Sequence, residues 1–377
     1  MSKTRVVNII TDLNIGGAGK VLQNFYSNCS HEDFEHWVIV PKGSLLIEIL
    51  RDKGIRVVAF EHLEAKSFSL KSIGPLTRLL KKIKPDIVHT HACLSGRIAA
   101  SLCRNVVVMY TRHCVYEPHP IAKSFIGRAL GWVVFSLFSD RAIAITPASM
   151  KNLTSTGIPG NKVDVLMNGT EPLRRMTEKS LLETRNNYGI AEDEFVFTML
   201  GRLEEIKGHR YFIKAAKIVS EKEPRARFLI AGEGNTVNEL KKMAMDMGDR
   251  IIFAGFIKDV YKIVNITDVL VNASYGTEAS SLAIIEAMSL GKPVIASDYG
   301  GNPYQVEDNV TGLIIPQKDE TALADAMLKL MKDKNIYEQM SIKSVEVFRE
   351  RFTAAIMAAN IEDIYRKSVK KDVPKIS

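Results

Sequence analysis

The sequence predicts an α/β protein made of two doubly wound domains, each with a parallel sheet covered by helices on both faces. Short β-branched runs recur along the chain with helical segments between them, which is typical of parallel sheets. The length of 377 residues is too great for one ordinary domain and suits two. The hydrophobic fraction of 46% and the charged fraction of 25% are those of a soluble globular protein.

The predicted strands form two sets along the chain. The first set comprises residues 5–10, 37–40, 56–60, 86–91, 106–110 and 142–146, and the second comprises 195–200, 227–231, 251–254, 269–272, 293–297 and 312–315. The charged, helix-forming stretch 171–187 between the sets is the expected linker region. We expect an N-terminal domain over 1–171, a C-terminal domain over 172–355, and a last helix over about 356–377 with a basic tail.

Cysteine usage and the first residues predict a cytoplasmic protein. The four cysteines are scattered with no Cys-x-x-Cys pair, as expected for reduced thiols. The start, MSKTRVVNII, runs straight into a strand pattern and leaves no room for a signal peptide. The longest apolar stretch, 125–138, contains Arg128 and is shorter than the ~20 residues of a membrane-spanning helix. It could lie on a membrane surface, but it precedes a strand, so we interpret it as a core helix.

The positive charge of the chain is concentrated in its first half. Residues 1–170 hold 21 Lys and Arg against 12 Asp and Glu, a net charge of +9. Residues 171–377 hold 30 against 31, a net charge of −1. This asymmetry is a hint about the partner of the first domain rather than about the fold.

A glycine-rich turn follows the first strand. A P-loop needs glycine at position 14 and Ser or Thr at position 21, where the sequence has Asn14 and Val21. A dinucleotide fingerprint needs a small residue at position 22, which is Leu22, so a nicotinamide oxidoreductase is disfavoured. What remains is a turn at Gly16 and Gly17 that opens a helix. It either lets backbone approach a ligand closely or is simply a tight turn.

Two cations follow the first strand of the second set. Arg202 and Lys207 are flanked by Gly201 and Gly208, and both side chains can converge on one anionic group. Charge-assisted bonds of this kind contribute about 1.5–3 kcal/mol each. Taken alone, the pattern fits a solvated loop slightly better.

A pair of glutamates eight residues apart is the strongest single signal. Ser280 or Ser281 would cap a helix that contains Glu286, and the free N–H groups at its start would favour a phosphate. Glu286 would lie on the order of 8 Å along the axis, with Glu278 just before the helix. One carboxylate could then bind a ribose and the other a sugar. The alternative is a capping carboxylate and a surface glutamate, but the apolar neighbours of Glu286 fit a surface poorly.

The ordered set of motifs resembles glycosyltransferase family 4 over almost the whole chain. In the second half these motifs are Gly-Arg and Lys-Gly, Gly232-Glu233-Gly234, Phe253-Ala254-Gly255, the glutamate pair, Glu286 to Val294, Gly300-Gly301 and Thr311 to Leu313. In the first half they are Gly16-Gly17, His89-Thr90-His91, Thr111-Arg112-His113 and Asn168-Gly169. Each motif is weak by itself, whereas their order is specific.

The resemblance implies a GT-B fold, in which two Rossmann-like domains face a central cleft. It implies a retaining, metal-independent hexosyltransferase that uses a nucleotide diphosphate sugar, with UDP as the expected nucleotide and no cofactor. The chain accordingly contains no Asp-x-Asp triplet, the usual metal-binding motif of the other glycosyltransferase fold. The rival interpretations are a sugar-nucleotide epimerase or phosphorylase on the same fold, and a non-catalytic binding subunit.

Carried over by position, the resemblance assigns roles to the charged residues. Arg202 and Lys207 would hold the diphosphate, Glu286 the ribose and Glu278 the transferred sugar. The sequence departs from the family where the usual Gly-Phe-Gly is replaced by Ala279-Ser280-Ser281, which puts the shape of the sugar pocket in doubt.

His113 would bind the sugar from the facing domain and completes the expected catalytic set. The other residues expected to bind the nucleotide sugar are Gly16, Gly17, Phe256, Ser281 and Leu282. Strand alternation puts His89 and His91 on one face. A zinc site there would need a third ligand at metal spacing, which the sequence lacks, so we interpret His89 as structural.

The expected acceptor is a lipid-linked glycan of bacterial surface polysaccharide or lipopolysaccharide. In GT-B proteins the last helix crosses back onto the acceptor-binding domain, so the tail over 365–377 would add five cations and one aspartate to the basic side. The hypothesis is attachment to the anionic inner face of the membrane, with no nucleic-acid partner. The alternative is an ordinary basic surface.

Overall fold

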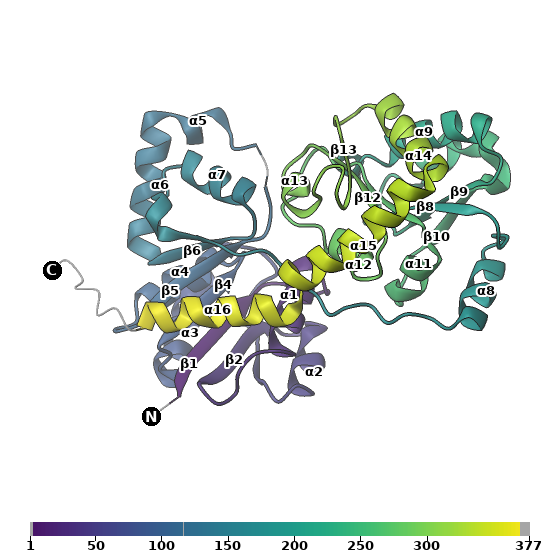
Figure 1. The fold of residues 1–377 in the computed structure, drawn as a ribbon. Helices are drawn as coiled ribbons and strands as arrows, with labels where there is room; N and C mark the ends of the chain where they lie inside the picture. The colour runs from purple at the N-terminus through teal and green to yellow at the C-terminus, as the bar shows by residue number, and fades with distance from the viewer. Residues whose placement is uncertain (1–2, 116, 370–377) are drawn as a thin grey trace. The chain divides into compact units, whose positions relative to one another are not determined.

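The computed structural model describes residues 3–115 and 117–369, and the chain divides into two compact units. The first unit contains Met1–Gly169 and Ala354–Ser377, and the second contains Thr170–Thr353. Within the described ranges, we find no helix with the length and apolar character needed to cross a bilayer. Figure 1 shows the helices and strands of both units.

The first unit is built on a seven-stranded parallel sheet with strand order β3-β2-β1-β4-β5-β6-β7. Its strands are β1 (Thr4–Ile10), β2 (Phe34–Pro41), β3 (Arg56–Phe60), β4 (Ile87–His91), β5 (Val107–Arg112), β6 (Arg141–Ala144) and β7 (Val163–Val165). Its helices are α1 (Gly17–Tyr26), α2 (Leu46–Arg51), α3 (Leu70–Ile83), α4 (Leu94–Ser101), α5 (Pro120–Lys123), α6 (Phe125–Phe138), α7 (Pro147–Ser155) and α16 (Ala354–Val369). Consecutive residues of β1 are buried because helices cover both faces of the sheet.

The second unit repeats this architecture with a six-stranded parallel sheet of order β10-β9-β8-β11-β12-β13. Its strands are β8 (Phe195–Leu200), β9 (Ala226–Ala231), β10 (Ile251–Gly255), β11 (Val269–Asn272), β12 (Val294–Ser297) and β13 (Gly312–Ile315). Its helices are α8 (Glu178–Asn187), α9 (His209–Lys222), α10 (Val237–Met243), α11 (Val260–Ile266), α12 (Leu282–Ser289), α13 (Asn302–Gln305), α14 (Glu320–Lys332) and α15 (Lys334–Arg351).

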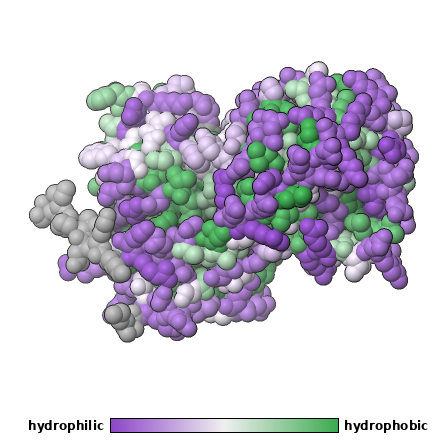
Figure 2. Space-filling model, in the orientation of Figure 1, coloured by the Kyte–Doolittle hydropathy of each residue, from purple (hydrophilic) through white to green (hydrophobic). Residues whose placement is uncertain are grey.

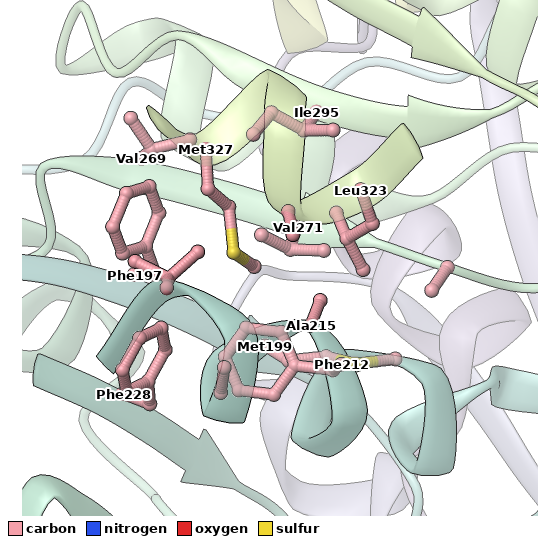
Figure 3. Packing of buried hydrophobic residues seen from close by; sticks show 14 of the residues in the cluster. Phe197, Met199, Phe212, Ala215, Phe228, Val269, Val271, Ile295, Leu323 and Met327 are labelled. Atoms are coloured by element: carbon pink, nitrogen blue, oxygen red, sulfur yellow. The ribbon is translucent and has the colours of Figure 1, made fainter. Parts of the chain in front are cut away.

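Aromatic and methionine side chains fill the core of the second unit. The rings of Phe197 and Phe228 stack with centroids 5.7 Å apart, and Phe212 of α9 meets Phe228 edge-on. Figure 3 shows these rings with Met199 and Met327 between the sheet and its helices. This core holds the strands in the register that sets the positions of the loops at their carboxyl ends.

The predicted strands are confirmed, and one strand was missed. β7 has only three residues, of which Val165 is 44% exposed, so it carries too little hydrophobic pattern to be recognised. The predicted linker region 171–187 was expected to form helix, and its second half does so as α8. Arg185 of α8 is buried and donates to the carbonyl oxygens of Ala191 and Glu194.

The interpretation of 125–138 as a core helix is wrong. These residues do form a helix, α6, but Phe135 is its only buried residue. Phe125 and Ile126 are 88% and 78% exposed. An apolar run with no charged face does not show by itself which side packs against the protein, and here that side is the one with two glycines.

Helix α16 returns to the first unit and packs against α1 (Figure 1). Tyr365 is buried, and Glu362 accepts a hydrogen bond from the backbone of Ser30. Arg366 forms an ion pair with Asp33 at 2.8 Å. Much of the predicted basic tail, including its three terminal lysines at positions 370, 371 and 375, lies outside the described residues.

Candidate active site

A partly buried ion pair lies at the carboxyl edge of the second sheet. Lys207 Nζ donates to Glu278 Oε2 at 2.8 Å, and the two side chains are 18% and 8% exposed. Glu278 Oε2 also accepts from Ser274 Oγ at 3.0 Å and from Asn272 Nδ2 at 3.4 Å. The two loops follow β8 and β11, which are neighbours at the point where the strand order reverses. Ligands of open parallel sheets bind at such a point.

Two glycines bring the Lys207 segment against the loop that follows β11. Gly208 has a φ of +81°, and a Cβ there would lie 2.1 Å from the carbonyl oxygen of Ala273. A Cβ at Gly276 would lie 2.4 Å from Cβ of Ile206. The Lys-Gly motif therefore has a physical reason: only glycine allows the approach that places Lys207 beside Glu278.

The Gly-Glu-Gly segment holds the loop of Arg202 in a similar way. Cβ atoms at Gly232 and Gly234 would lie 1.9 and 2.2 Å from the carbonyl oxygens of Gly201 and Leu203. The side chain of Arg202 itself is 70% exposed and pairs with Glu204 at 2.6 Å. An exposed pair of this kind contributes at most about 1 kcal/mol, so a phosphate can compete for the guanidinium.

The backbone of Glu278 is fixed by the glycine pair that follows β12. Gly300 has a φ of +60°, and a Cβ there would lie 2.0 Å from the carbonyl oxygen of Glu278. The N–H of Gly301 donates to the same oxygen at 2.9 Å. Three glycine motifs of the sequence thus serve one purpose, which is to set the positions of Arg202, Lys207 and Glu278.

Helix α12 begins at Leu282 and carries the buried Glu286. Ser281 occupies the N-cap position as expected, but its side chain makes no capping bond. Gln305 holds the backbone of Ser281 instead, because its Oε1 accepts from the N–H of Ser281 at 2.7 Å and its Nε2 donates to the Ser281 carbonyl at 3.1 Å. A phosphate at this helix start would displace Gln305 or use the amides that follow.

Three histidines gather at the carboxyl ends of β4 and β5 in the first unit. Nδ1 of His91 lies 2.9 Å from Nε2 of His113, and its Nε2 lies 2.9 Å from Oδ1 of Asn8. Asn8 Nδ2 donates to the hydroxyl of Tyr26 at 2.8 Å. Because Asn8 presents an acceptor, His91 carries its proton on Nε2 and accepts at Nδ1. His113 therefore donates through Nε2, and its Nδ1 remains an acceptor.

His89 joins this cluster to α16. Its Nδ1 lies 2.7 Å from the hydroxyl of Tyr365 and its Nε2 lies 2.7 Å from Oγ1 of Thr111. Burial lowers the pKa of His89 to about 3 and that of His113 to about 4. Burial, with the nearby histidines adding to it, also holds the pKa of His91 well below its usual range. The cluster is therefore neutral at pH 7.

Stability is expected to fall as the pH falls from 6.5 towards 4. A histidine whose pKa is lowered in the folded state binds its proton more readily when unfolded, so acid favours unfolding. The contribution to the free energy of unfolding is up to about 1.4 kcal/mol per pH unit for each histidine.

His209 of the second unit tests this expectation, because burial lowers its pKa to about 3 and neither ring nitrogen has a hydrogen-bond partner. His209→Leu should make the thermal midpoint of the second unit less sensitive to pH.

Exposed His62 offers the control for this measurement. His62→Gln should leave the pH dependence of the thermal midpoint unchanged. An unchanged slope in His209→Leu would show that His209 does not contribute to the acid sensitivity.

The remaining predicted residues occupy two other places. Phe256 directly follows β10 and is 73% exposed. Gly16 and Gly17 stand at the start of α1. A Cβ at Gly17 would meet no atom within 4 Å, and the residue has no positive φ. Packing and backbone conformation therefore do not explain this glycine, whereas a ligand that approaches the backbone would.

Sequence reasoning missed the partners that hold the expected residues. Asn272 and Ser274 surround Glu278, and Asn8 orients His91, which in turn bonds His113. The available signal was a cluster of short polar side chains at the ends of predicted buried strands.

Comparison with solved structures shows the fold. HepE of Anabaena, solved in complex with UDP, superimposes with a TM-score of 0.82 at 20% identity, over 97% of this chain and 100% of HepE. A glycosyltransferase of Rickettsia africae has a TM-score of 0.82 at 20% identity, over 99% and 100%. The protein therefore has the GT-B fold.

Sequence comparison shows the family. The profile described as Glycosyltransferase Family 4 matches residues 15–174, and that described as Glycosyl transferases group 1 matches residues 182–346. A similar chain is the UDP-Gal:alpha-D-GlcNAc-diphosphoundecaprenol alpha-1,3-galactosyltransferase of Escherichia coli, at 28% identity over 97% of both chains. Another is the alpha-monoglucosyldiacylglycerol synthase of Streptococcus pneumoniae, at 25% identity over 86% and 77%. The protein belongs to glycosyltransferase family 4.

Proposed function

We propose that the protein is a retaining, metal-independent hexosyltransferase that moves a sugar from a UDP-sugar onto a lipid-linked glycan. The observation that carries this proposal is the largely buried Lys207–Glu278 pair, which lies where the strand order of the second sheet reverses. A cation beside a carboxylate that can accept from sugar hydroxyls suits a donor with a diphosphate on one side and a sugar on the other.

Each charged residue has a distinct role in the proposed reaction. Lys207 and Arg202 bind the diphosphate, Glu278 binds hydroxyls of the transferred sugar, and Glu286 binds the ribose. Nδ1 of His113, which remains an acceptor, would take a hydrogen bond from a sugar hydroxyl. In the second unit the exposed ring of Phe256 and the backbone at Leu282 would contribute to the donor site, and in the first unit the backbone at Gly17 would be open to a ligand.

The proposed reaction breaks the bond between the anomeric carbon and the β-phosphate oxygen. The electron pair of that bond goes to the leaving oxygen, and the acceptor hydroxyl forms the new bond on the same face of the sugar. Its proton passes to the leaving diphosphate. In this proposal Lys207 is a preorganised donor to the charge that develops on the leaving oxygen, and Arg202 would leave Glu204 to join it, a task otherwise done by a metal ion.

The choice of donor and acceptor rests on relatives and on charge. HepE was solved with UDP, and the E. coli relative acts on a diphosphoundecaprenol-linked sugar according to its name. The net charge of +9 over residues 1–170 favours attraction to an anionic lipid or membrane surface. We therefore propose that the enzyme works at the cytoplasmic face of the membrane.

Screening nucleotide sugars with the purified protein tests the proposal. We expect slow hydrolysis of one UDP-sugar without acceptor, and the anomer first released should match that of the donor when followed by NMR. The rate should be unchanged by EDTA. Loss of activity in EDTA that magnesium or manganese restores would contradict metal independence. Release of an epimerised UDP-sugar, or phosphorolysis, would favour the rival enzyme classes.

A further inference from the structure

Helix α6 turns an apolar face to solvent. Seven large apolar side chains of α5 and α6 are at least 40% exposed: Ile121 69%, Phe125 88%, Ile126 78%, Leu130 62%, Trp132 52%, Val133 40% and Leu137 61%. Figure 2 shows green and pale residues over the part of the first unit that holds α5 and α6. Scattered apolar side chains are normal on a surface, but a contiguous group on one helix marks an interaction site. We call this group the α6 face.

The opposite side of α6 fixes the helix in this orientation. A Cβ at Gly131 would lie 1.9 Å from the carbonyl oxygen of Thr156, and one at Gly127 would lie 2.0 Å from that of Ile121. Gly157, with a φ of +96°, approaches the carbonyl oxygen of Arg128 in the same way. Helical periodicity places both glycines on the side of buried Phe135. Turning the α6 face inward would force large side chains into spaces that admit only hydrogen atoms.

The charge around the α6 face indicates what covers it. Residues 118–139 contain two cations, Lys123 and Arg128, and no Asp or Glu, and Lys123 forms an ion pair with Glu117 just before this range. Apolar side chains, a tryptophan, the exposed Arg128 and the net charge of +9 over residues 1–170 suit a helix that lies in the interface of an anionic bilayer. At 14 residues, α6 is too short to span the ~30 Å of hydrocarbon, so it would lie on the membrane.

We propose that the α6 face docks the first unit on an anionic lipid bilayer, with its apolar side chains among the acyl chains and Arg128 at the lipid phosphates. The proposal rests on the proposed function only for its purpose, which is to bring the enzyme to a lipid-linked acceptor. The docking surface itself follows from the exposure, orientation and charge of α6. Unlike binding through a basic surface alone, docking through this face should persist in part at high salt.

Vesicle sedimentation with a matched pair of variants tests the docking surface. Full-length protein is mixed with phosphatidylcholine vesicles with and without phosphatidylglycerol. Ile126→Ser removes a side chain that is 78% exposed on α6, and Met245→Ser removes one that is 76% exposed in the second unit. We expect Ile126→Ser to lower the partition coefficient on anionic vesicles by about tenfold. This is the effect expected when one apolar side chain is no longer transferred from water into the bilayer. Met245→Ser should bind like the wild type.

Fluorescence of Trp132 tests whether α6 itself enters the bilayer. The sequence has two tryptophans, Trp37 and Trp132, so Trp37→Phe leaves Trp132 as the only emitter. We expect its emission to shift to shorter wavelength on anionic vesicles and to be quenched by brominated acyl chains. Equal binding by Ile126→Ser and Met245→Ser, or no quenching of Trp132, would overturn the proposal.

A second copy of the chain is the competing occupant of the α6 face. Dimers in sedimentation without vesicles, abolished by Ile126→Ser, would also overturn the proposal.

Hydrolysis of the UDP-sugar in solution distinguishes failure of the docking proposal from failure of the proposed function. If the protein hydrolyses the UDP-sugar but does not bind vesicles, only the docking surface is refuted. If it binds vesicles but hydrolyses no donor, the proposed function is refuted.

Discussion

Lys207→Ala is expected to lower the turnover of sugar transfer by about 100-fold or more. Loss of one preorganised donor to the charge of a transition state typically has this effect. Lys207 is largely buried beside Glu278, and its position is set by the close approach of Gly208 to Ala273. Steady-state kinetics with the UDP-sugar would measure the loss, which should fall mainly on kcat because the leaving oxygen gains charge only in the transition state.

The control for this prediction is Lys217, a lysine of the same unit that is 36% exposed and paired with Asp246. Lys217→Ala should leave turnover near that of the wild type. Because Lys207→Ala leaves the carboxylate of Glu278 buried without its cation, a thermal melt must show that the variant is folded. Near-normal turnover in folded Lys207→Ala would refute the diphosphate role.

Gly300→Ala is expected to destabilise the second unit and to impair transfer together. An alanine there must adopt a φ of +60°, and its Cβ would lie 2.0 Å from the carbonyl oxygen of Glu278. Gly301, which donates to the same oxygen, would shift with it. We expect a loss of several kcal/mol in the free energy of unfolding, more than the ~1 kcal/mol of an unfavourable φ alone. Chemical denaturation and transfer kinetics would measure both effects.

Gly189 provides a matched control in the same unit. It has a φ of +67°, but a Cβ there would meet no atom within 4 Å. Gly189→Ala therefore carries the backbone cost without the collision, and should lose about 1 kcal/mol with unchanged turnover. Equal losses in the two variants would mean that the contact with Glu278 is not important.

The regular part of the fold was predictable because parallel strands carry their own pattern. Buried runs such as Phe195–Leu200 and Val269–Asn272 are β-branched or aromatic, and turns bound them. Short edge strands and all-apolar helices do not carry such a signal. α6 was misread for this reason, since the side that packs is decided by backbone approach at Gly127 and Gly131 rather than by hydrophobicity.

The candidate site was predictable only as separate motifs. Residues 207 and 278 lie far apart in the sequence, and nothing in either motif shows that they form an ion pair. Their meeting depends on the strand order, which makes β8 and β11 neighbours. The hydrogen bond from Ser281 to Gln305 was equally hidden, because it depends on where α13 packs after β12.

The return of α16 to the first unit affects the order in which the protein can fold during synthesis. The hydroxyl of Tyr365 bonds His89 across 276 residues of sequence, and Met357 accepts from the N–H of Gly169. The ribosome therefore completes the second unit, Thr170–Thr353, before it makes the helix that covers Phe25 and Tyr26. Throughout that interval the nascent first unit exposes an apolar surface and an unfinished histidine network. A premature stop shortly after residue 353 would thus damage the half of the protein that was translated first.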